Sequence, residues 1–143
     1  MMEIVAPKAK EPGYSPDYYI SSSEVPAGRP YPYMIWQNAI HLNVHELFKA
    51  VKTGDTIADI KEGLSAGLWT IGIIEDSSIW GLSLEETKNL SDDEYSRKNR
   101  IIQKKYYEAE THFTAQTINE VSEILEFIDE QIESGQRPKP RIV

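Results

Sequence analysis

A strand, a helix and a second strand are predicted between residues 50 and 74, and this unit restricts the fold more than any other feature. Residues 50–53 (AVKT) favour a short strand, and residues 56–67 favour a helix that stops at a glycine. The apolar run 68–74 (LWTIGII) is typical of a buried strand. Strands joined in this way lie parallel, with a right-handed crossover. The predicted fold class is therefore α/β.

Further elements are predicted before this unit. Residues 1–10 resemble the end of a helix, which the following Glu-Pro-Gly breaks. Residues 18–20 (YYI) form a β-prone run. The loop 25–30 (VPAGRP) is rigid because its prolines fix several φ angles, and it leads into a helix that extends to Asn43.

Two polar helices and one amphipathic helix are predicted after the unit. Ser83 and Ser91 are each followed three residues later by glutamate, the capping-box pattern, which indicates two surface helices between residues 83 and 110. Residues 111–114 favour an edge strand, and Thr117 begins another capping box. The apolar residues of the last helix form one stripe: Ile118, Val121, Leu125, Ile128 and Ile132.

The length of 143 residues and the hydrophobic fraction of 40% are enough for one domain with a core. We place a partial domain at residues 1–135. The tail 136–143, which has prolines among basic residues, is expected to be frayed.

Composition disfavours several functions. The formal net charge of −8 argues against nucleic acid as a partner, because nucleic-acid binding relies on clustered Lys and Arg. The chain has no cysteine, so a metal would need oxygen or imidazole ligands. No apolar run approaches the roughly 20 residues of a membrane span. With no visible targeting segment, we expect a cytoplasmic protein and no membrane partner.

Two aspartates are the strongest candidates for chemistry. Asp55 and Asp59 lie where a buried strand ends and a helix begins, the edge at which open α/β sheets bind ligands. Asp55 is the candidate Mg²⁺ ligand, because Mg²⁺ takes one or two protein carboxylates beside water and phosphate oxygens. Asp55 could instead be an ordinary turn acid. Asp59 could serve only as a helix cap, since Thr56 precedes it by three residues.

Other polar residues give weaker signals. Arg29 lies in the rigid loop, where it could bind a phosphoryl group or neutralise carboxylates; a solvated loop arginine is the simpler interpretation of that residue alone. The three histidines, His41, His45 and His112, have no metal-binding spacing and are assigned no role. Trp69 belongs to the predicted core. The common nucleotide-binding and serine-hydrolase motifs are absent.

Three blocks of sequence together resemble phosphonoacetaldehyde hydrolase, a family of the haloacid dehalogenase superfamily. They are residues 23–33 (SEVPAGRPYPY), 52–63 (KTGDTIADIKEG) and 66–72 (AGLWTIG). The V-P-A-G-R-P-Y-P part is specific to this family, and the resemblance extends over nearly the whole chain. It implies the C-terminal half of a Rossmann-like parallel sheet, without the first strand, the cap domain and the second-motif strand.

The resemblance also implies a chemistry. Enzymes of this family cleave the carbon–phosphorus bond of phosphonoacetaldehyde to acetaldehyde and phosphate; a cap lysine forms a Schiff base with the aldehyde, and an aspartate attacks phosphorus with the help of Mg²⁺. By position, Arg29 matches the third-motif cation and Asp55 the fourth-motif magnesium ligand. Asp59 matches the second acid of that motif, and Thr56 would help to orient the site.

The chain also departs from the family pattern. It has no D-x-A-x-T-x-x-D motif for the nucleophile, and Lys8, Lys10, Lys49 and Lys52 match nothing in the cap. The nucleophile strand is central in the family's sheet. Its absence should leave the strand at Val51 with a long unpaired apolar edge, which favours pairing with another chain.

Three functional hypotheses follow. The first is a fragment of a phosphonoacetaldehyde hydrolase, a small-molecule hydrolase, with negligible turnover alone. The second is a noncatalytic assembly module that forms a homodimer or binds a separate N-terminal half. The third is another phosphatase of the superfamily, which the V-P-A-G-R-P-Y-P block disfavours.

Overall fold

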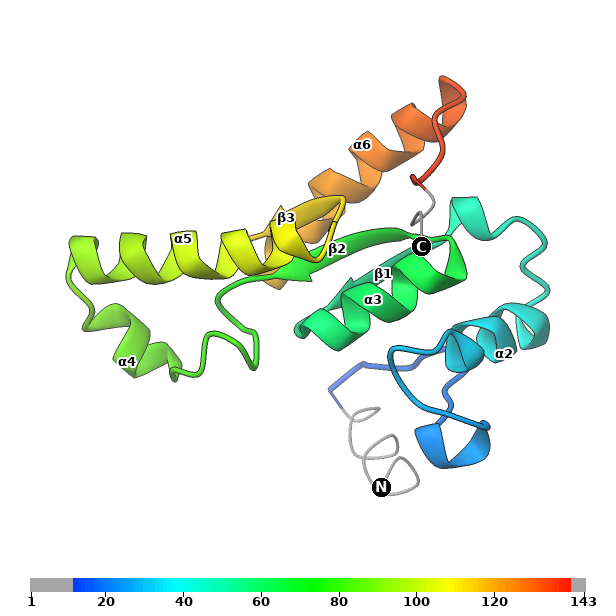
Figure 1. Ribbon diagram of the computed structural model, residues 1–143, viewed down its shortest axis with the longest axis horizontal. Helices are drawn as coiled ribbons and strands as arrows, with labels where there is room; N and C mark the ends of the chain where they lie inside the picture. Colours follow the sequence, from blue (N-terminus) through cyan, green and yellow to red (C-terminus); the bar gives the residue numbers. More distant parts are fainter. Residues whose placement is uncertain (1–11, 140–143) are drawn as a thin grey trace.

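The computed structural model describes residues 12–139, and at its centre is a three-stranded parallel sheet (Figure 1). Its strands are β1 (Val51–Gly54), β2 (Trp69–Ile73) and β3 (Phe113–Ala115), in the spatial order β1-β2-β3. Helix α3 (Ile57–Ala66) joins β1 to β2. The predicted strand–helix–strand unit and the α/β fold class are thus confirmed.

The ends of α3 follow from local sequence. Thr56 is the N-cap, and its hydroxyl accepts a hydrogen bond from the backbone N–H of Asp59. Gly67 ends the helix with φ +84°, in the left-handed region where glycine is favoured. β1 and β2 then pair in register, with Val51 opposite Trp69 and Gly54 opposite Gly72.

Helices cover both faces of the sheet, because successive side chains of a strand point to opposite faces. Helices α3 and α5 (Asp92–Glu108) cover one face, and α6 (Val121–Glu133) covers the other (Figure 1). The first face is packed by a buried cluster that contains Ile60, Leu64, Ile74, Trp80, Ile102 and Tyr106. The second is packed by Trp69, Ile71, Ile73, Ala115 and Ile128.

The remaining helices are short. They are α2 (Tyr33–His41), α4 (Leu84–Lys88) and three single-turn 3₁₀ helices, Ser22–Glu24, Leu47–Lys49 and Ile118–Glu120. The predicted capping boxes at Ser83 and Ser91 are both present, and they start α4 and α5. Helix α5 is not a pure surface helix, since Ile102 and Tyr106 reach the core.

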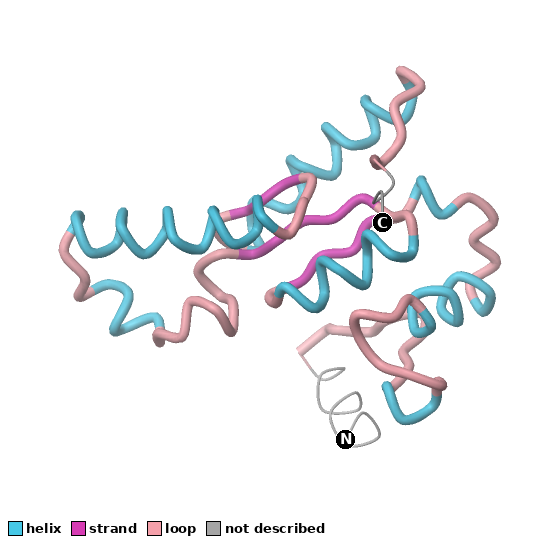
Figure 2. The backbone as a smooth tube through the Cα atoms, viewed as in Figure 1, coloured by secondary structure: helices cyan, strands magenta, loops and turns pink. Residues whose placement is uncertain are grey.

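The predicted strand at residues 18–20 is wrong. These residues are loop (Figure 2), and the Tyr18 ring stacks on His41 at 3.8 Å between ring centroids. The three-residue run is followed at once by Ser21, which caps a 3₁₀ turn together with Glu24. Local hydrogen bonds therefore take the place of strand pairing.

The predicted start and apolar stripe of the last helix are also partly wrong. Thr117 makes no side-chain cap, because Glu120 accepts instead from the backbone N–H of Gln116 at 2.7 Å. Ile118 and Leu125 are exposed. The face that packs on the sheet is made by Val121, Ile124, Ile128 and Ile132.

The described part of the tail contacts the domain. The guanidinium of Arg137 lies 3.8 Å from the centroid of the Phe48 ring, and Pro138 is buried. The helix end expected at residues 1–10 and the last tail residues 140–143 lie outside the described residues. The domain limits stay a prediction.

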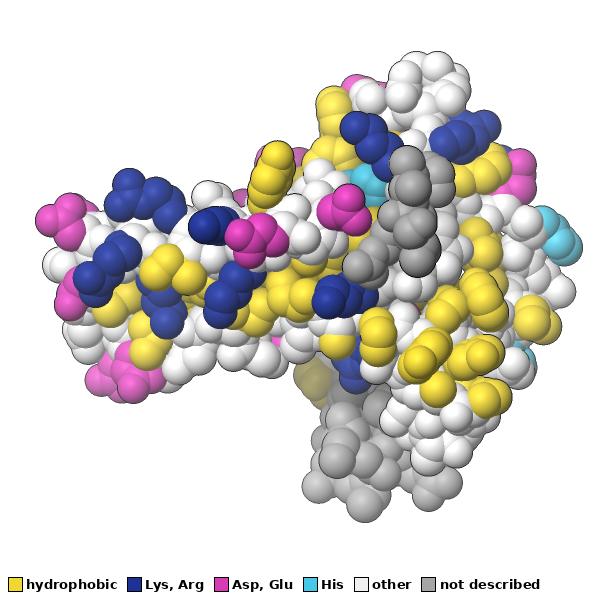
Figure 3. All heavy atoms as spheres, in the orientation of Figure 1, with side chains coloured by type: hydrophobic (Ala, Val, Ile, Leu, Met, Phe, Trp, Pro, Cys, Tyr) yellow, Lys and Arg dark blue, Asp and Glu magenta, His cyan; other side chains and the backbone are white. Residues whose placement is uncertain are grey.

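Hydrophobic side chains gather on the surface near α2 (Figure 3). The exposed ones of this segment include Tyr31, Tyr33, Trp36 and Ile40, and the Tyr33 and Trp36 rings meet edge to face at 5.9 Å. Between residues 12 and 139, no helix is both long enough and apolar enough to cross a bilayer.

Candidate functional site

The carboxyl end of β1 carries Asp55, as predicted. Its Oδ2 accepts two hydrogen bonds from Ser78, one from the hydroxyl at 2.6 Å and one from the backbone N–H at 3.2 Å. Ser78 belongs to the loop after β2, so two neighbouring parallel strands deliver both residues to the same edge. No described residue hydrogen-bonds Asp55 Oδ1.

Asp59, in the first turn of α3, has a different environment. Its Oδ1 lies 2.6 Å from Arg29 Nη1 and 3.2 Å from Lys52 Nζ. Its Oδ2 accepts a hydrogen bond from the Thr56 hydroxyl at 2.6 Å. The Asp59 side chain is only 4% exposed, whereas Arg29 is 46% exposed. Asp59 is therefore the partner of two cations as well as of the capping residue.

Glu62 extends this arrangement by one turn of α3. Its Oε2 lies 3.0 Å from Lys52 Nζ, and its side chain is 1% exposed. The contact with Lys52 is an ion pair by distance but lacks hydrogen-bond geometry, so neither carboxylate oxygen of Glu62 has a hydrogen-bond partner among the described residues. We call Arg29, Asp59, Lys52 and Glu62 the charged cluster.

The electrostatics around Asp59 and Arg29 favour the ionised form of both groups. Burial acts to raise the pKa of Asp59, but the Thr56 hydrogen bond and the charges of Lys52 and Arg29 outweigh it, and the pKa lies below its usual value. The hydrogen bond to Asp59 and its negative charge raise the pKa of Arg29. Arg29 is thus a permanent cation with part of its donor fork turned to solvent.

Close packing at two glycines permits this geometry. A Cβ at Gly54 would overlap with the Asp59 side chain, so glycine allows α3 to begin directly against the end of β1. A Cβ at Gly63 would lie 2.8 Å from Lys52 Cβ, so glycine leaves room for the lysine stem. The sheet and α3 are therefore held at the distance that the ion pairs need.

The residues present partly fit a magnesium site. Asp55 offers one hard carboxylate oxygen without a competing donor, and Mg²⁺ needs only one or two such ligands. Asp59 does not fit as a second ligand, because both of its oxygens are hydrogen-bonded or paired with cations. Within residues 12–139, no group of three or more His, Asp or Glu side chains could hold a metal.

Sequence reasoning missed three residues of this edge. The sequence patterns assign no role at this edge to Lys52, Ser78 or Glu62. The period-2 pattern of β1 could have placed Lys52 and Gly54 on one face, and helical spacing could have placed Glu62 beside Asp59. Ser78 lies 23 residues from Asp55, and no local pattern indicates their contact.

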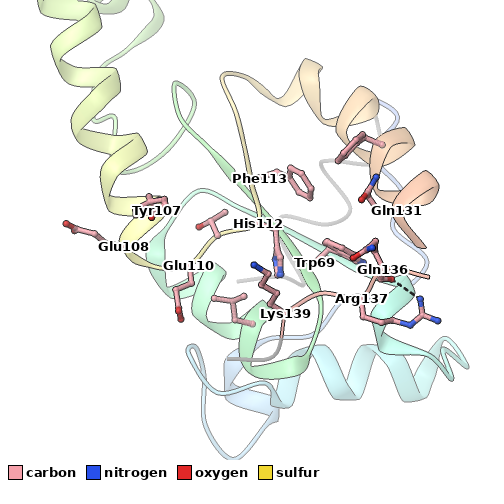
Figure 4. A pocket seen from close by; sticks show the side chains of 13 residues that line it. Trp69, Tyr107, Glu108, Glu110, His112, Phe113, Gln131, Gln136, Arg137 and Lys139 are labelled. Atoms are coloured by element: carbon pink, nitrogen blue, oxygen red, sulfur yellow. Dashed lines mark hydrogen bonds between the residues drawn. The ribbon is translucent and has the colours of Figure 1, made fainter. Parts of the chain in front are cut away.

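A cavity of about 690 Å³ lies at the opposite edge of the sheet, away from Asp55 (Figure 4). Its lining includes Trp69 and Phe113, the first residues of β2 and β3, and His112 and Lys139. His112 Nδ1 accepts from the backbone N–H of Thr70 at 3.1 Å, and burial together with the Lys139 charge lowers its pKa. Parallel strands place this cavity far from Asp55, and His112 serves the β2–β3 junction.

Comparison with known proteins bears on the family. Phosphonoacetaldehyde hydrolase of Bacillus cytotoxicus is 43% identical over 131 residues, which are 92% of this chain and 50% of that enzyme. The enzyme of Bacillus thuringiensis gives the same identity and coverage. The resemblance to phosphonoacetaldehyde hydrolase is confirmed. The chain spans about half the length of these curated relatives of the phosphonoacetaldehyde hydrolase family.

Solved structures agree with this resemblance. A phosphonoacetaldehyde hydrolase-like protein from Oleispira antarctica has a TM-score of 0.91 at 28% identity, over 96% of this chain and 50% of that one. A second structure has a TM-score of 0.80 at 26% identity, over 96% of this chain and 70% of that one. No family model matches the chain. The sheet therefore corresponds to part of a larger phosphonoacetaldehyde hydrolase-like fold.

Proposed function

We propose that this chain supplies the metal-binding and phosphoryl-binding part of a phosphonoacetaldehyde hydrolase, which cleaves phosphonoacetaldehyde to acetaldehyde and phosphate. The observation that supports this best is the pairing of two features at one edge of the sheet. Asp55 has one carboxylate oxygen that accepts no hydrogen bond from the described residues. Arg29 has an exposed guanidinium, and Asp59 binds one of its nitrogens.

Asp55 is the proposed ligand of Mg²⁺. Ser78 holds Oδ2 with two hydrogen bonds, so Oδ1 is the oxygen that faces a cation. Water, a phosphoryl oxygen and groups outside this chain would complete the coordination. A bound Mg²⁺ would neutralise charge on the phosphoryl oxygens.

Arg29 is the proposed phosphoryl-binding cation. A guanidinium has five N–H donors in a planar fork, and Asp59 engages only Nη1, so the other donors can bind phosphoryl oxygens. Thr56 and Asp59 orient this cation and do not touch the substrate. Thr56 does so by holding Asp59 Oδ2.

The covalent steps require residues that the printed sequence does not contain. No D-x-A-x-T-x-x-D motif is present to supply the nucleophile, and no lysine matches the Schiff-base lysine of the family. We therefore expect negligible turnover from the 143-residue chain alone.

A chimaera would test this proposal, in which the chain replaces the matching half of the Bacillus cytotoxicus enzyme. We expect Mg²⁺-dependent release of acetaldehyde and phosphate, and a loss of about 10²-fold or more in turnover with Asp55→Ala or Arg29→Gln. Asp76→Ala, an exposed acid of the Ser78 loop, is the matched control and should keep turnover. Full turnover in the Asp55→Ala chimaera would overturn the proposal.

The second candidate is an assembly module, and the free edge of β1 favours it. Among the described strands β1 pairs only with β2, and its residues are half-buried where those of β2 are buried. The edge could pair with a strand of a separate half or of a second copy. Native mass spectrometry separates the outcomes, since a lone, stable monomer that does not bind the other half of the enzyme would count against assembly.

The third candidate, a phosphatase of the same superfamily, can be distinguished in the chimaera assay. If this half belonged to a phosphatase, the chimaera should hydrolyse a phosphate monoester or fail to release acetaldehyde from phosphonoacetaldehyde. We expect only the phosphonate to be cleaved.

A further inference from the structure

Four alternating charges connect the surface of the site with the protein interior. The order is Arg29, Asp59, Lys52, Glu62, with contacts of 2.6, 3.2 and 3.0 Å between neighbours. Their side chains are 46%, 4%, 25% and 1% exposed in this order, so the two cations are the more exposed members and the two carboxylates are buried. The row of charges therefore begins at Arg29, the proposed phosphoryl-binding residue, and ends at the buried Glu62 of α3.

Lys52 makes two contacts that reach different turns of α3. Its Nζ lies between Asp59 in the first turn and Glu62 three residues later. Side chains three residues apart lie on the same face of a helix. The lysine thus ties β1 to two successive turns of the helix that carries Asp59.

We propose that Lys52 and Glu62 are positioning residues for Arg29. Lys52 shares Oδ1 of Asp59 with Arg29 and so keeps that carboxylate in one orientation. Glu62 holds the ammonium of Lys52 from the other side. Together they fix the direction in which Arg29 presents its remaining donors. This inference rests on the proposed role of Arg29 in phosphoryl binding.

The contacts of Asp59 leave it few free positions for accepting hydrogen bonds. Its Oδ2 is bound by Thr56, and its Oδ1 is shared by Arg29 and Lys52. Without Lys52, the Asp59 carboxylate would have greater freedom to turn around the Thr56 contact. Without Glu62, Lys52 would lose its anchor beneath α3. Glu62, which is fully enclosed, has Lys52 as its cationic partner among the described residues.

A purely structural role makes a different prediction. If Lys52 only neutralises a buried carboxylate, then removing both charges should restore the protein completely. If Lys52 positions Arg29, the double removal should restore stability but not the order of the guanidinium. The double variant Lys52→Met/Glu62→Leu separates the two roles.

The experiment uses the 143-residue chain labelled with ¹⁵N-arginine. NMR exchange measures how fast the Arg29 guanidinium rotates about its Cζ–Nε bond, with the Arg29 signal assigned from Arg29→Gln. Lys52→Met should speed this rotation by about fivefold, the size expected for loss of one partly exposed ion-pair contact. Arg97, an exposed arginine of α5, is the internal reference.

Thermal unfolding of the same variants completes the test. Lys52→Met should lower the melting temperature, and Lys52→Met/Glu62→Leu should recover most of it while Arg29 still rotates fast. Lys61→Met, on α3 but outside the cluster, should change neither quantity. Slow rotation of Arg29 in the double variant would overturn the inference. The inference and the proposed function can fail separately, because Arg29→Gln in the chimaera tests only the proposed function.

Discussion

Asp55 and Asp59 are four residues apart and lie at the same edge of the sheet, yet their surroundings differ sharply. Asp59 is buried and held at both oxygens by Thr56, Arg29 and Lys52. Asp55 is half-exposed and held at one oxygen by Ser78. A carboxylate with both oxygens engaged orients its neighbours, whereas a carboxylate with a free oxygen can bind a cation.

The difference arises from where each residue stands relative to α3. Asp59 lies within the first turn, where its side chain points back toward β1 and meets Lys52. Asp55 lies before the N-cap, where the chain leaves the strand and the side chain reaches the loop after β2. Stability and ligand binding are thus divided between two acids of one motif.

Gly54→Ala should lower stability more than any other single change considered for this edge of the sheet. The new Cβ would overlap with Asp59, so α3 would have to move away from β1, at a cost of about 3 kcal/mol or more in the free energy of unfolding. Urea unfolding measures this loss in the free energy of unfolding. Gly67→Ala is the control, since its Cβ meets no atom within 4 Å and only the positive φ is strained, at about 1 kcal/mol. Equal losses for the two variants would contradict the packing explanation.

Asp59→Asn should cost more stability than Asp55→Asn. The first change leaves Arg29 and Lys52 without a shared anion, and we expect a loss of about 2 kcal/mol, reduced from the value for fully buried pairs because Arg29 is half-exposed. The second should cost less than about 1 kcal/mol. Urea unfolding of both variants gives the comparison directly. A larger loss with Asp55→Asn would reverse the division of roles.

Acid should weaken the Asp59 region selectively. The pKa of Asp59 is lowered in the folded state, so the unfolded chain takes up the proton first as the pH falls. The contribution of Asp59 to stability is therefore fully present above its ordinary pKa of about 3.9 and is lost as the pH falls toward the folded-state pKa. The free energy of unfolding, measured from pH 6 to pH 3, should fall less steeply in Asp59→Asn. Parallel curves would exclude Asp59 as a source of the acid sensitivity.

Ser78→Ala should have the smallest effect on stability. It removes an exposed hydroxyl contact to Asp55, and we expect a loss of less than about 1 kcal/mol. In the chimaera, however, the same variant should weaken the apparent affinity for Mg²⁺ by about tenfold, because Asp55 loses its orienting partner. Ser83→Ala, which removes a helix cap away from the site, should leave Mg²⁺ affinity unchanged. Unchanged Mg²⁺ affinity in Ser78→Ala would show that Ser78 does not orient the ligand.

Elements with strong local signals were predictable. Ser83, Ser91 and Gly67 mark helix ends, and each does so in the structure, because caps are satisfied by atoms a few residues away. The three-residue run at Tyr18 carried too weak a signal, because strand formation needs a neighbouring strand that local sequence does not reveal. Leu125 was assigned to the buried stripe for a similar reason, since the exact direction of α6 on the sheet decides which residues pack.

The sequence by itself determined the α/β class, the order of the elements around Asp55 and the resemblance to phosphonoacetaldehyde hydrolase, because these depend on periodicity, capping and matched motifs along the chain. Only the tertiary structure decided that Asp55 keeps a free oxygen while Asp59 is paired with two cations, Arg29 and Lys52. Those contacts join Arg29 and Ser78 to residues 30 and 23 positions away. Their distances are set by how α3 packs on β1, which no local pattern encodes.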